Sequence, residues 1–227
     1  MNLLALAVAP GIAICIFIYL KDKYNREPIG VLLASFILGM FAIVPALVLQ
    51  LLSGITLETL AGKPFAAVAI FAYGVVGFSE EGSKYMMLRL FVWRRTSFDE
   101  PFDGIVYAVM VGMGFATLEN IGYVLQHGYG TGILRMFLSV PAHATFAVLM
   151  GYYLGLAKFD PANRIKYLLL AIFLPVVFHG TFDYFLFIGN NLLHIAGALI
   201  SFIVAIQLSK IAIRKHQYLS RQTYGKL

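Results

Sequence analysis

Long apolar stretches fill almost the whole chain, and they limit what it can fold into. A helix needs about 20 apolar residues to cross the hydrocarbon core of a bilayer, whereas a membrane strand needs only about 10. Seven segments have the helical length, so the sequence predicts an all-α, polytopic bundle of about seven transmembrane helices. The stretch 65–78 is the one expected to be irregular. The segments are 2–20, 31–52, 65–92, 103–125, 133–155, 166–187 and 191–213.

Composition excludes two other classes of protein. Of the 227 residues, 60% are hydrophobic and 12% are charged, whereas soluble domains are about 45–50% apolar and about 25% charged. The net charge of +6 would suit a nucleic-acid partner. The basic residues are divided among short loops, however, and form no single polar face, which argues against nucleic acid and for the lipid bilayer. Cys15 is the single cysteine, so no intramolecular disulfide can form.

The loops predict how the bundle is oriented. Lys and Arg gather in the first, third and fifth loops and in the C-terminal segment, and the alternate loops are nearly free of them. Positive charge marks the cytoplasmic side of a membrane protein. The alternation therefore predicts seven spans with the N-terminus outside and the C-terminus in the cytoplasm. Residues 1–213 are expected to form one membrane-embedded domain, and 214–227 a basic cytoplasmic tail.

A few ionisable side chains lie inside the apolar segments, where each costs about 2.5–3.5 kcal/mol on insertion scales. At about 1.5 Å per helical residue, four helices bring such groups into one band about 10 Å deep. Unrelated polar positions would scatter over the depth of the membrane, so this band predicts one convergent site. The residues are Glu80, Glu81, Lys84, Glu119, His143, His179 and Asp183.

Local spacing adds detail to this site. Glu80 and Lys84 are four residues apart, the favoured order for a helical ion pair, while Glu81 is rotated by about 100° from Glu80. One carboxylate is therefore expected to pair with Lys84 and the other to face the site, where it could act as a general acid or base. His179 and Asp183 share a helix face, so the acid can orient the imidazole.

Five motifs, in order along the chain, resemble the PrsW family, part of the superfamily of CAAX-type and bacteriocin-processing intramembrane proteases. The first has the form EExxK and contains both glutamates. The resemblance covers about residues 5–185. The motifs are Phe78–Lys84, Phe102–Tyr107, Gly114–Asn120, Pro141–Ala144 and His179–Asp183.

This resemblance implies an intramembrane endopeptidase in the bacterial plasma membrane. It further implies site-1 cleavage of a membrane-anchored anti-sigma factor, or a similar single-pass protein, during a stress response. Glu80 and Glu81 would supply the base for a water, assisted by His143 or Glu119, because an acid stands where CAAX enzymes carry a second-motif His. The resemblance gives as catalytic residues Glu80, Glu81, His143 and His179, and as supporting residues Lys84, Glu119, Asn120 and Asp183.

Three alternatives use the same polar cluster. No cofactor is expected, but zinc proteolysis is an alternative in which Glu119, His143 and His179 bind the metal and Glu80 is the base. No HExxH motif supports it. A proton-coupled transporter could also need buried acids and histidines, although no inverted repeat is present. The third alternative is a non-catalytic membrane scaffold.

Overall fold

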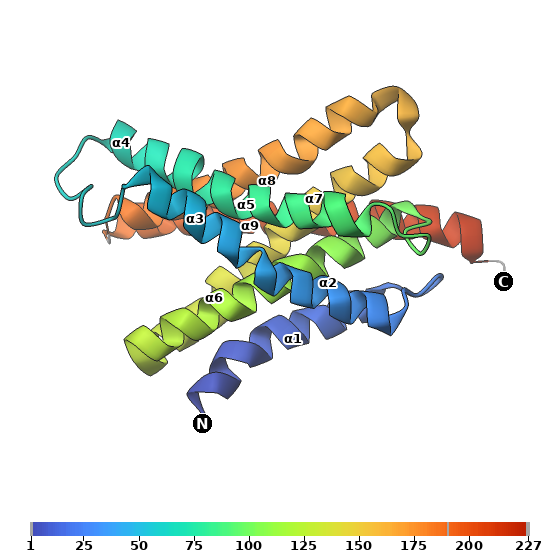
Figure 1. Ribbon diagram of the computed structural model, residues 1–227, viewed down its shortest axis with the longest axis horizontal. Helices are drawn as coiled ribbons and strands as arrows, with labels where there is room; N and C mark the ends of the chain where they lie inside the picture. Colours follow the sequence, from blue (N-terminus) through green and yellow to red (C-terminus); the bar gives the residue numbers. More distant parts are fainter. Residues whose placement is uncertain (1, 190, 226–227) are drawn as a thin grey trace.

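The computed structural model describes residues 2–189 and 191–225, and every regular element in these ranges is a helix. The predicted all-α fold is therefore confirmed. Figure 1 shows the helices lying side by side, most of them along the longest axis of the molecule. They are α1 (Leu3–Lys21), α2 (Ile29–Phe41), α3 (Ile43–Ser53), α4 (Phe65–Ala69), η1 (Ile70–Gly77), α5 (Phe78–Met87), η2 (Leu88–Val92), α6 (Pro101–Phe137), α7 (Ser139–Phe159), η3 (Pro161–Asn163), α8 (Arg164–Phe187) and α9 (Leu192–Tyr224).

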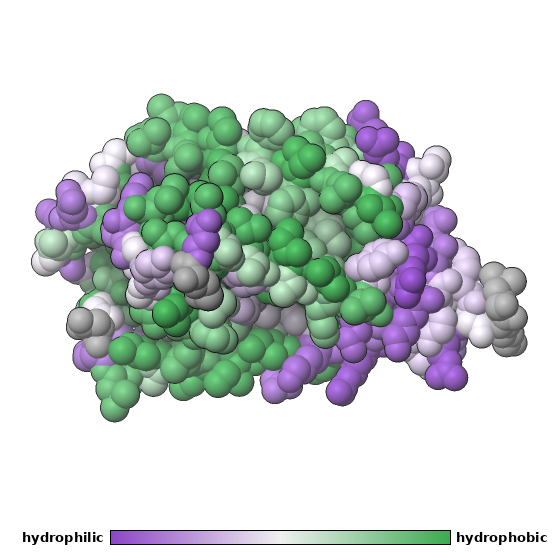
Figure 2. Space-filling view, turned by 90° about the horizontal axis from the view of Figure 1, so that it is seen from below, coloured by the Kyte–Doolittle hydropathy of each residue, from purple (hydrophilic) through white to green (hydrophobic). Residues whose placement is uncertain are grey.

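The surface suits a bilayer. Six helical stretches of the described residues are long and apolar enough to cross one. One of them, Pro101–Phe159, has 59 residues and contains α6 and α7, which pack against each other; at about 1.5 Å per residue it is long enough for two passes. In Figure 2 apolar residues cover the middle of the molecule, and hydrophilic residues gather mainly at the end that carries the C-terminus. The count of seven spans and the orientation stay predictions.

Two predicted spans are interrupted. The segment 31–52 forms two helices, α2 and α3, which meet at Ala42. The segment 65–92 changes form along its length, because η1 and η2 are π-helical and α5 lies between them. Irregularity in 65–78 was expected from the sequence. A π-helical turn is often found at a functional site, and here it directly precedes the two adjacent glutamates.

Helix boundaries differ from the prediction in two places. Residues 133–137 belong to α6 and not to the next helix, because α6 continues through a turn at Gly128, where φ is 77° and ψ is −162°. Helix α9 continues to Tyr224, into the segment expected to be a separate tail. Ser220 in this extension is buried and donates a hydrogen bond to Glu100, and such packing is invisible in hydropathy.

Helix α6 lies at the centre of the bundle, where it packs against α1, α2 and α7. Its first five turns are buried almost completely. It also lies close to α7, because a Cβ on Gly151 would meet the backbone of Gly104 and Ile105. Glycine therefore lets these two backbones touch, which brings the polar residues of α6 and α7 near each other further along the helices.

Acidic side chains are buried where the first loop meets the start of α6. Glu27 and Glu100 are only 4% and 3% exposed. Tyr107 donates a hydrogen bond to the Glu27 carboxylate, and Asp103 lies beside the same group. Burial raises the pKa of Glu27 and of Glu100 to about 7. These carboxyls are therefore easier to protonate in the folded protein than in the unfolded chain.

The raised pKa of Glu27 predicts how stability depends on pH. A carboxyl whose pKa rises on folding stabilises the fold below its unfolded pKa of about 4.3, and this contribution is lost as the pH rises towards about 7. In detergent, we expect the midpoint temperature of thermal unfolding to decrease as the pH is raised from about 5 to about 8. Glu27→Gln should flatten this dependence, and Glu58→Gln, at an exposed loop position, should not. A Glu27→Gln protein with the wild-type slope would contradict the assignment.

Candidate functional site

The two adjacent glutamates of α5 point in different directions. Glu81 has no exposed surface, and its Oε1 accepts hydrogen bonds from Lys84 Nζ at 2.7 Å and from His179 Nδ1 at 2.8 Å. Glu80 instead lines a cavity of about 550 Å³. Glu81 is thus the closer partner of Lys84, whose Nζ lies 3.7 Å from Glu80 Oε2. Glu80 is the carboxylate that faces the cavity, which is the division expected from their rotation around the helix.

His179, from α8, is surrounded by carboxylates. Because a carboxylate only accepts hydrogen bonds, Nδ1 carries the hydrogen that reaches Glu81. On the other side of the ring, Nε2 lies 3.2 Å from Asp183 Oδ2 and 3.8 Å from Glu80 Oε2. The ring of Phe146 stacks on the imidazole, with centroids 5.1 Å apart. Nδ1 already donates to Glu81. The carboxylates of Asp183 and Glu80 both lie near Nε2, and a proton or a metal ion between them and Nε2 would balance their charge.

His143, from α7, is held between opposite charges. Its Nδ1 lies 3.2 Å from the ammonium of Lys84, and its Nε2 lies 3.0 Å from Glu119 Oε2. An ammonium only donates and a carboxylate only accepts, so Nδ1 is the acceptor and Nε2 carries the hydrogen. The neighbours of the ring thus define both its orientation and its tautomer.

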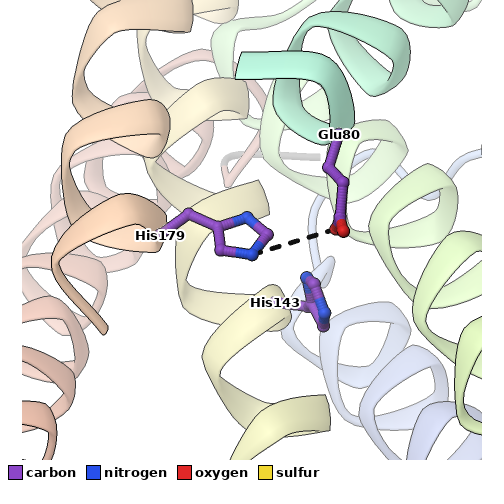
Figure 3. A group of neighbouring side chains, drawn as sticks. All are labelled: Glu80, His143 and His179. Atoms are coloured by element: carbon purple, nitrogen blue, oxygen red, sulfur yellow. Dashed lines mark ion pairs between the residues drawn. The ribbon is translucent and has the colours of Figure 1, made fainter. Parts of the chain in front are cut away.

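Glu80, His143 and His179 come from three different helices and point toward one another (Figure 3). Each is at most 5% exposed, and each offers one ligand atom within 4.8 Å of the other two. In residues 2–189 and 191–225 no other group of acids, histidines or cysteines has this geometry. The three helices therefore build one site, as the shared depth of the polar residues predicted.

The donors of this cluster fit a metal ion of the zinc class. Imidazole nitrogens and carboxylate oxygens are its usual ligands, and Oε2 of Glu80 is buried without a hydrogen-bond partner. Glu81 holds the far nitrogen of His179, as a carboxylate commonly does for a metal-binding histidine. His143 would serve as a ligand through Nδ1 if that nitrogen left Lys84, with Nε2 still held by Glu119. Glu80 takes the place that the zinc alternative assigned to Glu119.

The remaining predicted residues lie around the cluster, with one exception. Lys84, Glu119 and Asp183 each contact it directly. Asn120 faces away, because its amide donates to the carbonyl of Ala7 in α1 at 2.9 Å. Its neighbour Glu119 lines the cavity.

Three residues near the site were not found from the sequence. Gln50 of α3 donates to Ser79 at 3.2 Å and reaches Glu80 at 3.5 Å. Arg135 forms an ion pair with Glu119 at 2.7 Å. Phe146 stacks on His179. An arginine at the end of an apolar segment is typical of a membrane edge, and an isolated Gln or Phe in such a segment gives no signal in the sequence.

The buried Lys84–Glu81 pair predicts a coupled effect on stability. Removing one partner of such a pair leaves an uncompensated charge and costs about 3–5 kcal/mol. We expect Lys84→Met to lower the free energy of unfolding by about this amount, and Lys84→Met combined with Glu81→Gln to lower it less. Unfolding in mixed detergent micelles measures both, with the exposed Lys63→Met as control. The pairing would be contradicted if the double variant lost as much unfolding free energy as Lys84→Met and Glu81→Gln lose separately, added together.

Comparison with known proteins points in one direction. Residues 27–209 match the family described as "PrsW family intramembrane metalloprotease". The chain is 40% identical to "Protease PrsW" of Geobacillus kaustophilus over 82% of this chain and 80% of that protein. It is 38% identical to "Protease PrsW" of Bacillus subtilis over 83% and 84%, and 37% identical to that of Shouchella clausii over 98% and 99%. No solved structure matches.

Proposed function

Because this chain belongs to the PrsW family of intramembrane proteases, we propose that Glu80, His143 and His179 form its catalytic centre. The chain is a multi-pass bacterial membrane protein and a membrane-embedded hydrolase. One observation carries the assignment: three buried side chains of the types that activate water converge at the wall of one cavity. A structural ion-pair knot would need neither the cavity nor two histidines.

We propose that the same three residues hold a divalent metal ion of the zinc class. Their donor atoms, the unpartnered Oε2 of Glu80 and the carboxylate behind His179 support this. Such an ion, when bound, polarises a peptide carbonyl and lowers the pKa of a water molecule. The family description names metalloproteases, and this agrees with the donor set.

The other side chains of the centre position and balance it. The Glu81 carboxylate, neutralised by Lys84, holds Nδ1 of His179 and so directs Nε2 toward the cavity. Asp183 lines the cavity and contacts only His179 Nε2 among the groups of the centre. It is placed to accept the proton of the attacking water and to return it to the leaving amine. The amide of Gln50, at the same wall, is a donor for a developing oxyanion.

The rim of the cavity supports a membrane-anchored substrate. Leu47, Leu57, Leu134 and Leu186 line it, and each is 44–64% exposed on the outer surface of the bundle. An apolar rim favours a lipid-embedded segment over a peptide in water. We propose that the substrate is a single-pass membrane protein cut near its extracytoplasmic side. An anti-sigma factor whose cleavage starts a stress response is the substrate that the family motifs favour.

Substitution of the centre tests the proposed activity. In proteoliposomes containing single-pass reporter proteins, Glu80→Gln, His143→Ala and His179→Ala should each reduce cleavage by about 100-fold or more. Glu58→Gln and His127→Ala change the same residue types at exposed positions and should cut at the wild-type rate. Wild-type activity in all three centre variants would refute this assignment of the site.

A second experiment tests the metal. We expect a membrane-permeant chelator to abolish cleavage by the purified protein, and added Zn²⁺ to restore it. Metal analysis should find about one zinc ion per chain in the wild type and less in His179→Ala, while His127→Ala should bind as the wild type does. Cleavage that resists chelation would contradict the metal and leave Glu80 as the base of a metal-free site.

A further inference from the structure

Arg135 lies near the end of α6, far along the chain from the residue that it contacts. Sixteen residues separate it from Glu119, which is about 24 Å in a straight helix. The guanidinium Nη2 nevertheless lies 2.7 Å from Glu119 Oε2. The contact is possible because the chain turns at Gly128, where φ is 77° and the backbone leaves the helical conformation. Glycine adopts this conformation at little cost, and other residues rarely do.

The Arg135 guanidinium contacts three residues in one turn of α6. Besides its ion pair with Glu119, Arg135 donates from Nε to Asn120 Oδ1 at 3.0 Å, and it lies 4.0 Å over the ring of Tyr123. Asn120 is itself tied to α1 through the carbonyl of Ala7. A cation with several contacts to neighbouring side chains holds those side chains in a defined orientation. The end of α6 is therefore fixed to its middle.

A single oxygen atom connects Arg135 to His143 of the proposed catalytic centre. Oε2 of Glu119 accepts from Arg135 at 2.7 Å and from His143 Nε2 at 3.0 Å. On the far side of the imidazole, Lys84 contacts Nδ1 at 3.2 Å. Arg135, Glu119, His143 and Lys84 thus form a continuous row of alternating partners. Without Arg135, the half-buried Glu119 would keep Lys84 as its nearest cation, and Lys84 lies beyond the His143 ring.

We propose that Arg135 is a positioning residue that orients the His143 ring through Glu119, and that the turn at Gly128 exists to deliver it there. The inference rests on the proposed function, because it concerns the same catalytic centre. Arg135 also lines the cavity, so the orientation of His143 depends on a residue at the wall that substrate would contact. Groups that hold a metal-binding histidine typically change metal affinity or activity by about 10–100-fold when removed.

Substitution of Arg135 separates positioning from simple stability. In the reporter assay, Arg135→Met should reduce kcat by about tenfold or more and leave KM within about threefold. Arg135→Lys keeps a positive charge beside Glu119 and should therefore retain most of the wild-type kcat. Arg94→Met removes an exposed arginine of a loop and should behave as the wild type does.

The turn itself can be tested with a matched pair. A Cβ at Gly128 or at Gly122 would meet nothing within 4 Å, and only Gly128 has a positive φ. Gly128→Ala therefore strains the turn without crowding a neighbour. It should reduce kcat in the same direction as Arg135→Met, while Gly122→Ala leaves kcat unchanged.

Zinc affinity provides a measurement that does not depend on cleavage. Competition with a fluorescent chelator should show binding about tenfold weaker in Arg135→Met, and near the wild-type value in Arg135→Lys. Wild-type kcat and wild-type zinc affinity in Arg135→Met would overturn the inference, as would a loss of kcat that Arg135→Lys does not recover. A wild-type protein that cuts no reporter would instead count against the proposed function, and zinc affinity would still test Arg135.

Discussion

The contact between Lys84 and Glu81 is the interaction on which the site depends. Both side chains are almost completely buried, and they lie in a helical stretch that is long and apolar enough to cross a membrane. An isolated charge is costly there. Lys84 neutralises Glu81, and Glu81 can then hold His179. The same ammonium contacts His143 on its other side. One cation thus sets the orientation of both histidines and leaves Glu80 to face the cavity.

The fold brings these groups together by departing from regular helices where the site requires it. A π-helical segment precedes the glutamates, and the earlier segment 31–52 is broken at Ala42, between α2 and α3. The turn at Gly128 returns the end of α6 toward Glu119. Glycine contacts between α6 and α7 bring their backbones together. Regular helices give the bundle its transmembrane length, and its irregular points place the chemistry.

Metal binding and the charge pattern of the centre are connected. Oε2 of Glu80, which has no hydrogen-bond partner, and the carboxylates around His179 leave an excess of acceptors, which a divalent ion would balance. His143 already has partners on both ring nitrogens, so one of these contacts would have to open before the ring could serve as a ligand. The ring is held by Lys84 and by Glu119, with Arg135 behind Glu119. These residues would therefore govern whether the three proposed ligands can act together.

The sequence alone determined the class of fold and predicted that a few buried polar residues would lie near one another. Apolar length allows only membrane helices, and ionisable groups at one depth are too costly to be there without a shared role. Only the tertiary structure decided which of Glu80 and Glu81 faces the cavity, that Asn120 turns toward α1, and that Arg135 contacts Glu119. Hydropathy and helical spacing describe one helix at a time. These choices depend on packing between helices and on a backbone turn at Gly128 that has no signature in composition.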